Sequence, residues 1–333
     1  MTAGARRVCA RAPAKINLCL AVLGRRPDGF HELDSLFLAL DLADTLAVER
    51  TGEPGVHLTL TGPAAEGVPA GEENLAVRGA RAALARAGAA GGLRLELEKH
   101  VPSGAGLGGG SSDAAAALAA SAELLGLDPD DAALRAELEA LGSDCAFFLR
   151  ARATGLARCT GRGERVEPLA LAFPWTVVLL TPAFGCATAE VYRALAAGPY
   201  PSTGPTGPPG APGATGPCAG REARALLALP LERLRGELAN DLEAAALRSR
   251  PELAAIRAVL EGLEPGAFRL TGSGSSFFAL CTDRAAGQAL CARAEAALRG
   301  RRYALRGAWV LRARGRGIEL APSRSHFGTG PTP

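Results

Sequence analysis

The residues best suited to chemistry lie in one glycine-rich stretch, residues 101–118, whose sequence is VPSGAGLGGGSSDAAAAL. Five glycines fall between positions 104 and 110, and glycine lets the main chain approach a ligand closely. The Ser-Ser-Asp triplet at 111–113 has side chains that cap a helix, which we expect to run to Leu125 and to end at Gly126. A helix N-terminus after a glycine loop presents N–H groups and the positive end of the helix dipole. The stretch therefore predicts a site for an anion such as phosphate.

Two better-known glycine patterns do not describe this stretch. A Walker A loop ends in Gly-Lys-Ser/Thr, and no such triplet follows here. A Rossmann fingerprint is a weaker mismatch: residues 93–101 alternate like a half-exposed strand, and no acidic residue follows a second strand at the usual distance. A flexible surface loop is the remaining alternative, although a plain loop seldom leads into so well-formed a helix start.

Lysine and asparagine are scarce in this arginine-rich chain. Lysine occurs only at Lys15 and Lys99, and asparagine only at Asn17, Asn74 and Asn240. Lys15 and Asn17 stand two apart in an expected strand, so their side chains share one face. Lysine in a chain that otherwise uses arginine indicates a place for a compact ammonium group, although chance could produce the same pattern.

Three further polar residues have a structural and a functional interpretation. Asp144 follows an expected helix at 128–142 and is either an exposed cap or a carboxylate whose burial beside an ammonium group makes it a base. His31 follows a Pro-Asp-Gly turn and is as easily a structural histidine as a functional one. Asn74 precedes an amphipathic helix and is equally a helix cap or a ligand residue.

Composition narrows the class of protein. The 333 residues suggest about two domains, and a net charge of +3 indicates neither nucleic acid nor an anionic membrane as a partner. Eight cysteines without CxxC spacing predict scattered thiols in a reducing cytosol. The N-terminus lacks the apolar core of a signal peptide, and the most apolar run, residues 170–184, is too short to span a bilayer. We therefore expect a cytoplasmic protein.

The elements that must position these residues can be traced along the chain, with a domain boundary near Pro168. In the first domain, residues 1–168, we expect antiparallel strands at 9–24, 35–40, 44–50 and 56–61, a helix at 74–88 and a hairpin at 153–169. In the second, residues 169–316, we expect strands at 175–182, 268–281 (with a glycine turn) and 303–312, and helices at 187–196, 231–249, 251–261 and 283–298. Residues 198–220 are almost all Pro, Gly, Ser, Thr and Ala and predict a disordered insertion, and residues 317–333 predict a flexible tail.

Four blocks in this order resemble one family. They are APAKINL with GRRPDGFHELDSL (12–36), PSGAGLGGGSSDAA (102–115), LGSDCAFFL (141–149) and LTGSGSSFFAL (270–280). Together they closely resemble the GHMP small-molecule kinases over most of residues 10–312. The chain departs from the family pattern at Phe30, commonly Tyr, at Ala146, commonly Pro, and in the insertion. The second departure places the turn that holds Asp144 in question.

The resemblance implies an α+β fold of two lobes, with a ribosomal-protein-like N-terminal domain and a ferredoxin-like C-terminal domain. It implies transfer of the γ-phosphoryl group of ATP, with Mg²⁺, to a small-molecule alcohol. The first and third blocks further imply that the acceptor is the 2-hydroxyl of cytidine diphosphate methylerythritol, in non-mevalonate isoprenoid biosynthesis. Such a reaction needs positioning and charge neutralisation more than covalent chemistry.

The resemblance also implies residue roles. Asp144 would accept the hydroxyl proton, and Lys15 would orient Asp144 and stabilise the developing alkoxide. Asn17 would position the acceptor. The triphosphate would lie on the backbone of Pro102, Ser103, Gly104, Ala105, Gly106, Leu107, Gly108, Gly109, Gly110, Ser111 and Ser112.

Further implied roles concern the metal and the two bases. Ser112 would offer its hydroxyl to the metal ion. Phe30 and Tyr192 would sandwich the cytosine and His31 would contact its edge, whereas the adenine pocket would be lined by Asn74 and the backbone near Lys99.

Three rival functions stay open. Another GHMP kinase would act on homoserine, mevalonate or a sugar, and the DGFH block argues against it. A catalytically silent GHMP-fold regulator would bind a metabolite without needing Lys15 or Asp144. A nicotinamide-dependent oxidoreductase rests only on the Gly-x-Gly pattern.

Overall fold

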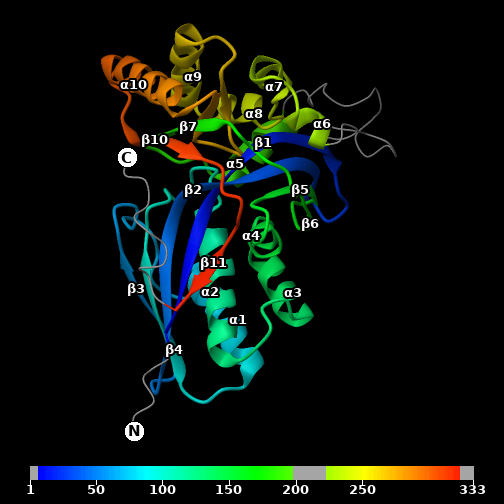
Figure 1. Ribbon diagram of the computed structural model, residues 1–333, viewed down its shortest axis with the longest axis vertical. Coiled ribbons are helices and arrows are strands. Elements are labelled where there is room, and N and C mark those ends of the chain that lie inside the picture. Colours follow the sequence, from blue (N-terminus) through cyan, green and yellow to red (C-terminus); the bar gives the residue numbers. More distant parts are fainter. Residues whose placement is uncertain (1–6, 198–222, 323–333) are drawn as a thin grey trace.

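Two β-sheets organise the chain in the computed structural model, which describes residues 7–197 and 223–322 (Figure 1). The strands of the larger sheet are β1 (Arg7–Arg25), β2 (His31–Thr51), β3 (Gly55–Thr61), β4 (Gly92–Glu98), β5 (Leu156–Gly161), β6 (Arg165–Pro168) and β11 (Glu319–Ala321). The strands of the smaller sheet are β7 (Thr176–Pro182), β8 (Phe268–Leu270), β9 (Phe277–Cys281) and β10 (Leu305–Arg312). The helices are α1 (Leu75–Ala87), α2 (Gly109–Leu125), α3 (Ala132–Leu141), α4 (Cys145–Arg150), α5 (Thr188–Ala196), α6 (Ala223–Leu227), α7 (Leu231–Glu237), α8 (Glu243–Ser249), α9 (Pro251–Leu263) and α10 (Arg284–Gly300).

The N-terminal lobe is built on the long antiparallel pair of β1 and β2. β2 is one continuous strand where two were expected: its first part pairs with β5 and its last part with β4. The expectation of an all-antiparallel sheet was wrong for β3, which pairs with β4 in parallel. The helix α1 connects these two strands, and a crossover of this length returns the chain in the same direction.

The alanine run of α2 forms the centre of this lobe. Every residue from Ser112 to Ala122 is buried in the helix, and α1 packs against it closely. A Cβ placed on Gly79 of α1 would lie 2.3 Å from the carbonyl oxygen of Ala114. Small side chains on both helices therefore bring their backbones together, and α2 is held rigidly under the sheet.

The C-terminal lobe places its helices over the sheet β10-β7-β9-β8. The single helix expected at 231–249 is two short helices, α7 and α8. The chain between them leaves the helical path because it pairs with β1: the Leu20 N–H donates to Ala239 O at 2.9 Å, and the Asp241 N–H donates to Leu20 O at 2.9 Å. This pairing joins the two lobes at β1, the strand that also carries Lys15.

The C-terminal segment returns to the N-terminal lobe, so the predicted boundaries of the second domain and tail need correction. β11 pairs with β1 at Cys9–Arg11, and residues 319–321 are thus a strand of the first sheet. Short edge strands of this kind depend on the partner and not on their own sequence. The predicted insertion 198–220 lies outside the described residues, as do 323–333.

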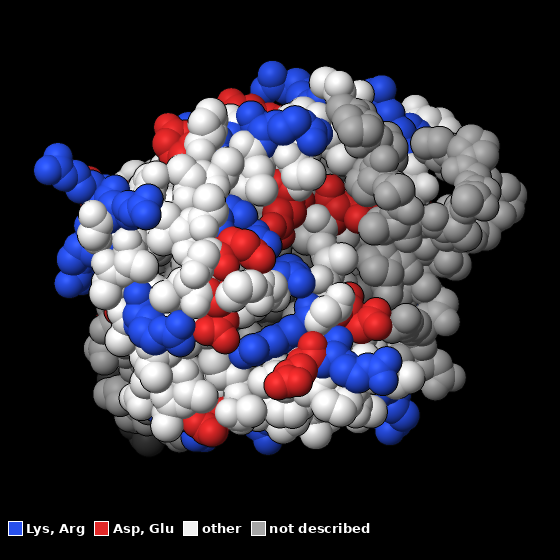
Figure 2. Space-filling view, turned by 90° about the horizontal axis from the view of Figure 1, so that it is seen from above, with Lys and Arg blue, Asp and Glu red and all other residues white. Residues whose placement is uncertain are grey.

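Side-chain chemistry at the surface and in the core is mixed. On the face seen in Figure 2, basic and acidic side chains are interspersed with uncharged ones.

Six described cysteines are free thiols, whereas Cys19 is disulfide-bonded, which the sequence interpretation did not anticipate. Across the described ranges, no helix is long and apolar enough to cross a membrane.

Candidate active site

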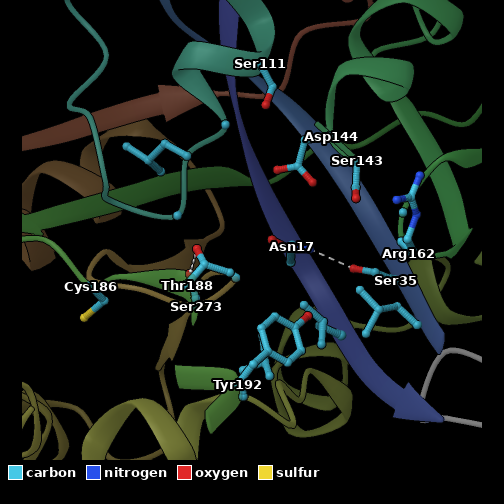
Figure 3. A pocket seen from close by; sticks show the side chains of 18 of the residues that line it. Asn17, Ser35, Ser111, Ser143, Asp144, Arg162, Cys186, Thr188, Tyr192 and Ser273 are labelled. Atoms are coloured by element: carbon cyan, nitrogen blue, oxygen red, sulfur yellow. Dashed lines mark hydrogen bonds between the residues drawn. The ribbon is translucent and has the colours of Figure 1, made fainter. Parts of the chain in front are cut away.

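A cavity of about 1100 Å³ lies between the two lobes. Its walls come from β1, the glycine loop, the residues before α4, the turn before β2, the helix α5 and the turn between β8 and β9. In the close-up of Figure 3, the Asp144 carboxylate faces open space between Ser111, at the start of α2, and Asn17, on β1. The cavity therefore brings together most of the residues that the sequence singled out.

The glycine loop forms one wall with its backbone. All residues from Pro102 to Ser111 line the cavity. The helix α2 begins at Gly109, earlier than expected, and its N-cap is Gly108 with φ +68° and no side-chain cap. The Ser-Ser-Asp triplet consequently occupies the first turn and does not cap the helix. Because the first N–H groups of a helix have no acceptor within it, this end is suited to a phosphate group.

The two serines of the loop lie on different sides of α2. Ser111 lines the cavity, whereas Ser112 is fully buried and its Oγ has no hydrogen-bond partner within the described ranges. Successive residues of a helix point about 100° apart. The predicted metal-facing hydroxyl of Ser112 is therefore turned away from the cavity, and the one that faces it belongs to Ser111.

Lys15, Asn17 and Asp144 form a connected group in the middle of the cavity. The Nζ of Lys15 lies 3.2 Å from Oδ2 of Asp144 and donates to Oδ1 of Asn17 at 2.8 Å. The Asn17 amide donates to Ser35 Oγ at 2.9 Å, and the Lys15 ammonium lies 4.7 Å from the centroid of the Phe37 ring. Lys15 is only 3% exposed. The ammonium is thus fixed by several contacts against a carboxylate that keeps access to the cavity.

The position of Asp144 follows from the short helix α4. Asp144 is the N-cap residue, yet its side chain makes no capping hydrogen bond, so its carboxylate is available to the cavity. Phe147 and Phe148 of α4 are fully buried and anchor the helix in the core. Ala146 is also buried within α4, and the alanine leaves Asp144 beside Lys15. Asp144 thus occupies the cap position of α4 without a capping hydrogen bond, and its carboxylate lines the cavity.

The opposite end of the cavity carries aromatic side chains. His31 and Tyr192 stack on each other with ring centroids 4.8 Å apart. Phe30 is 51% exposed, and the guanidinium of Arg162 lies 4.8 Å above its ring. Burial and the nearby Arg25 lower the pKa of His31 below its ordinary value, which favours the neutral imidazole. The cavity thus offers flat faces at this end and phosphate-binding amides at the other.

Several cavity residues were not foreseen from the sequence. They are Ser35, Ser143, Arg162 and Thr188, whereas Ser273 belongs to the fourth of the recognised motif blocks. Ser143 adjoins Asp144 in a block that was recognised, and Arg162 occupies the Gly-Arg-Gly turn. These positions in the sequence were the signals that could have predicted Ser143 and Arg162 as cavity residues. Nothing local distinguished Thr188, whose hydroxyl lies 2.9 Å from that of Ser273 across the gap between α5 and the β8–β9 turn.

Asn74 and Lys99 are not among the residues that line the cavity, so this cavity does not include the predicted adenine contacts of Asn74 and of the backbone at Lys99. Asn74 caps α1, because its Oδ1 accepts from Ala76 N at 2.9 Å and its amide donates to Pro69 O at 2.6 Å. The structural interpretation accounts for both of its polar groups. Its neighbour Leu75 does line the cavity.

Lys99 is buried in a triad of charged side chains beneath the glycine loop. Its Nζ donates to Asp44 at 2.5 Å and to Asp113 at 2.6 Å. Asp44 also accepts from the backbone N–H of Val101 at 2.8 Å. The triad therefore joins β2, the end of β4 and the first turn of α2, and it holds the entry of the loop in place. Burying these charges is tolerable because each is paired.

Burial raises the pKa of Asp113 to about 8; Lys99 opposes this rise and the nearby Asp44 adds to it. The unfolded chain releases the Asp113 proton near pH 4, whereas the folded chain keeps it. Folded molecules bind more protons between these two values, so this group's contribution to stability falls as pH rises toward 8.

We expect Asp113→Asn to gain stability relative to the wild type between pH 6 and pH 8.5, because the amide does not titrate. Thermal unfolding of both proteins at the two pH values and one ionic strength measures the effect. Asp131→Asn is the matched control: this exposed N-cap has a lowered pKa and does not titrate in that window. A stability difference that stays constant between the two pH values would contradict the raised pKa.

Known proteins resemble this chain along nearly its whole length. The family model for the GHMP kinases N terminal domain matches residues 74–152, and the model for the GHMP kinases C terminal domain matches residues 223–300. A 4-diphosphocytidyl-2-C-methyl-D-erythritol kinase of Thermus thermophilus is 40% identical over 328 residues, which cover 96% of this chain and 98% of that protein. The protein of the same description from Pelotomaculum thermopropionicum is 38% identical over 288 residues, 86% of this chain and 93% of its own.

Solved structures agree with this relationship. A crystal structure of 4-(cytidine 5'-diphospho)-2C-methyl-D-erythritol kinase matches with a TM-score of 0.67 and 39% identity over 91% of this chain and 98% of that chain. A homoserine kinase from Cytophaga hutchinsonii has the same TM-score at 18% identity, covering 96% and 99% of the two chains, and shares the fold. The expected two-lobed α+β architecture is thereby confirmed. The chain belongs to the GHMP kinase family.

Proposed function

We propose that this chain transfers the γ-phosphoryl group of ATP to the 2-hydroxyl of 4-diphosphocytidyl-2-C-methyl-D-erythritol. The observation that carries the proposal is the contact of Lys15 with Asp144, 3.2 Å apart between the glycine loop and the aromatic end of one cavity. A kinase needs a base and a cation at this place, between its nucleotide and its acceptor. The relatives named above carry this activity in their descriptions.

The reaction would proceed by positioning and charge neutralisation. The amides at the start of α2 would hold the triphosphate in line with the acceptor hydroxyl. Asp144 would accept the proton of that hydroxyl as it attacks the γ-phosphorus. Lys15 would keep the carboxylate ionised and oriented and would stabilise negative charge on the attacking oxygen. Asn17 holds Lys15 by the bond at 2.8 Å and would guide the acceptor.

The donor groups at the cavity suit Mg²⁺ bound together with ATP. Mg²⁺ usually takes one or two protein oxygen ligands and completes its shell with phosphates and water. The Ser111 hydroxyl and the Asp144 carboxylate both line the cavity near the start of α2. The described residues contain no cluster of three or more His, Cys, Asp or Glu that would form a protein-only metal site. When bound, the ion would neutralise charge on the transferring phosphate, and the Ser111 hydroxyl would hold it there, which leaves the Asp144 carboxylate free to act as the base.

The aromatic end of the cavity suggests the acceptor, and the state of the cysteines suggests where the protein is located. The stacked pair of His31 and Tyr192 would receive the cytosine, and Phe30, beside Arg162, would offer a further aromatic face. Aromatic faces bind a base by stacking. We further propose a cytoplasmic location, supported by the six free thiols among the seven described cysteines, of which Cys19 is the exception. The binding partner that we propose is the small-molecule substrate itself.

A substrate panel tests the proposal. Purified protein with ATP and Mg²⁺ would receive the cytidine diphosphate substrate, homoserine, mevalonate or a hexose, and ADP release would be measured by a coupled assay. We expect a kcat/KM for the cytidine substrate that is at least about tenfold higher than for any other alcohol. The other alcohols lack the cytosine, and the loss of one contact of ~1.4 kcal/mol corresponds to a factor of ten. Faster turnover of another alcohol would overturn the assignment of the acceptor, whereas ATP hydrolysis without any phosphorylated alcohol would overturn the kinase itself.

Tyr192 offers a sharper test of the cytosine end. We expect Tyr192→Leu to raise KM for the cytidine substrate by about tenfold, because a base–aromatic stack contributes ~1–3 kcal/mol. KM for ATP should stay near the wild-type value. Tyr192→Phe keeps the ring and should restore the KM for the cytidine substrate in steady-state kinetics. Equal rises in both KM values for the leucine variant would mean that Tyr192 supports the lobe and does not contact the base.

A further inference from the structure

Asn240 is the scarce asparagine to which neither the sequence nor the proposed reaction assigns a role. It lies between α7 and α8, in the segment that pairs with β1 at Leu20. Asp241 strengthens this attachment, since its Oδ2 accepts from the Val22 N–H at 2.9 Å. The strand β1 carries Lys15 and Asn17 as well. Asn240 is therefore tied to the strand that bears Lys15 and Asn17.

The Asn240 side chain uses all of its polar groups on nearby backbone. Its amide donates to the carbonyl oxygens of Leu270 and Gly272, both at 2.8 Å. Its Oδ1 accepts from the Leu242 N–H at 3.0 Å. The first two bonds hold the glycine turn at 271–276, which connects β8 to β9. One short side chain thus fixes the last carbonyl of β8 and one carbonyl of the turn that follows it.

The turn at 271–276 lies directly against Lys15 and Asn17. Gly272 lines the cavity with φ +56°, and a Cβ there would lie 3.3 Å from Asn17 Oδ1 and 3.6 Å from Lys15 Nζ. The Asn17 N–H donates to Thr271 Oγ1 at 2.9 Å. A shift of Gly272 by even part of an ångström would therefore change the space around the Lys15 ammonium.

The same turn also supports the glycine loop from the other lobe. The Ser276 N–H donates to Ala105 O at 3.2 Å. A Cβ on Gly106, whose φ is +76°, would lie 2.3 Å from Thr271 O, so the two backbones meet with no room for a side chain. The turn at 271–276 hence contacts both the phosphate-binding loop and the lysine strand.

We propose that Asn240 is a positioning residue of the phosphoryl-transfer site: its amide holds the 271–276 turn against Lys15 and Asn17 on one side and the glycine loop on the other. Asn240 is not among the residues that line the cavity, so it acts through Gly272 and not on the substrate. The inference rests on the proposed kinase function for its kinetic consequence. The anchoring of the turn stands on the contacts alone.

Asn240→Asp is the variant that isolates the amide. It keeps the size of the side chain and the oxygen that accepts from Leu242 N, but it places a carboxylate oxygen opposite two carbonyls. We expect kcat to fall by about 10- to 100-fold, since a displacement near 1 Å can cost about 10² in such a site. KM for ATP should change much less.

Ile256→Val controls for lost stability. Ile256 is buried in the core of the C-terminal lobe on α9 and does not line the cavity. Removing its methylene lowers the stability of the fold by ~0.5–1.5 kcal/mol without touching the turn, so kcat should stay normal. Both variants are assayed well below their melting temperatures. An equal loss of kcat in Ile256→Val would reduce Asn240 to a structural residue.

Two further measurements make the inference independent of the substrate. Hydrogen exchange of the 271–276 amides should accelerate in Asn240→Asp and stay unchanged in Ile256→Val. Gly272→Ala disturbs the same turn directly, so the double variant should lose less kcat than the product of the two single losses. Unchanged exchange, multiplicative losses or a near-normal kcat for Asn240→Asp would overturn the inference. A wild-type protein that fails to phosphorylate the cytidine substrate would overturn the proposed function, while the exchange measurement would still decide the anchoring.

Discussion

Asp144→Asn should lower kcat by about 10²- to 10⁴-fold, the range that a general base contributes. The amide has the same shape as the carboxylate but cannot accept the hydroxyl proton. Asp144 makes no capping bond to α4, so the substitution should leave the helix in place. KM for ATP should remain close to normal, because the triphosphate is assigned to the backbone amides of the glycine loop.

Steady-state kinetics with the cytidine substrate and ATP measure this effect, and thermal unfolding shows that the variant is folded. The matched control is Asp131→Asn, the same chemical change at the exposed N-cap of α3. That control should keep wild-type kinetics. An Asp144→Asn variant that retains more than about a tenth of the wild-type kcat would remove Asp144 from the role of base, because even a weak general base contributes about 10².

Lys15→Arg should lower kcat by about 10²-fold even though it preserves the charge. The Lys15 ammonium is 3% exposed and lies 3.2 Å from Asp144, 2.8 Å from Asn17 and 4.7 Å from the Phe37 ring centroid. A longer, planar guanidinium does not fit between these groups. It would displace Asp144 by an amount that is sufficient for the expected loss.

Lys15→Met separates charge from shape. If the compact ammonium is required, the arginine and methionine variants should show similarly low kcat values, with KM for ATP changed much less. A near-normal kcat for Lys15→Arg beside an inactive Lys15→Met would mean that any positive charge is enough. A defect confined to KM for ATP would assign Lys15 to nucleotide binding and would contradict its pairing with the base.

Local rules were enough to find the parts of the site. The glycine loop followed from backbone freedom and the end of the next helix at Gly126 from C-capping, whereas the predicted N-cap triplet was wrong. The shared face of Lys15 and Asn17 followed from the two-residue period of a strand, and the structure joins their side chains at 2.8 Å. The four motif blocks pointed to the GHMP kinases, and the similarity of the whole chain confirms that family. These signals are encoded within a few residues of one another, so a sequence displays them directly.

The sequence alone identified the glycine loop and predicted its use but did not show which of its hydroxyls faces the cavity. The helix α2 starts at Gly109 and not after the Ser-Ser-Asp triplet. Successive side chains of a helix point about 100° apart, so two adjacent hydroxyls in its first turns face different surroundings. Ser112 is therefore buried while Ser111 lines the cavity, and only the packing of α2 against α1 and the sheet decides that start.

The second scarce lysine shows the same limit. The resemblance placed the backbone near Lys99 in the adenine pocket and gave its side chain no role, and the structure binds that ammonium between Asp44 and Asp113. Asp44 lies on β2 and Asp113 on α2, so the pairing depends on how a strand and a helix from different parts of the chain meet. The pairing of Asn240 with Gly272 arises in the same way. The sequence determined which residues could do chemistry, and the tertiary structure decided which of them reach the cavity, because burial and ion pairing depend on contacts between residues distant along the chain.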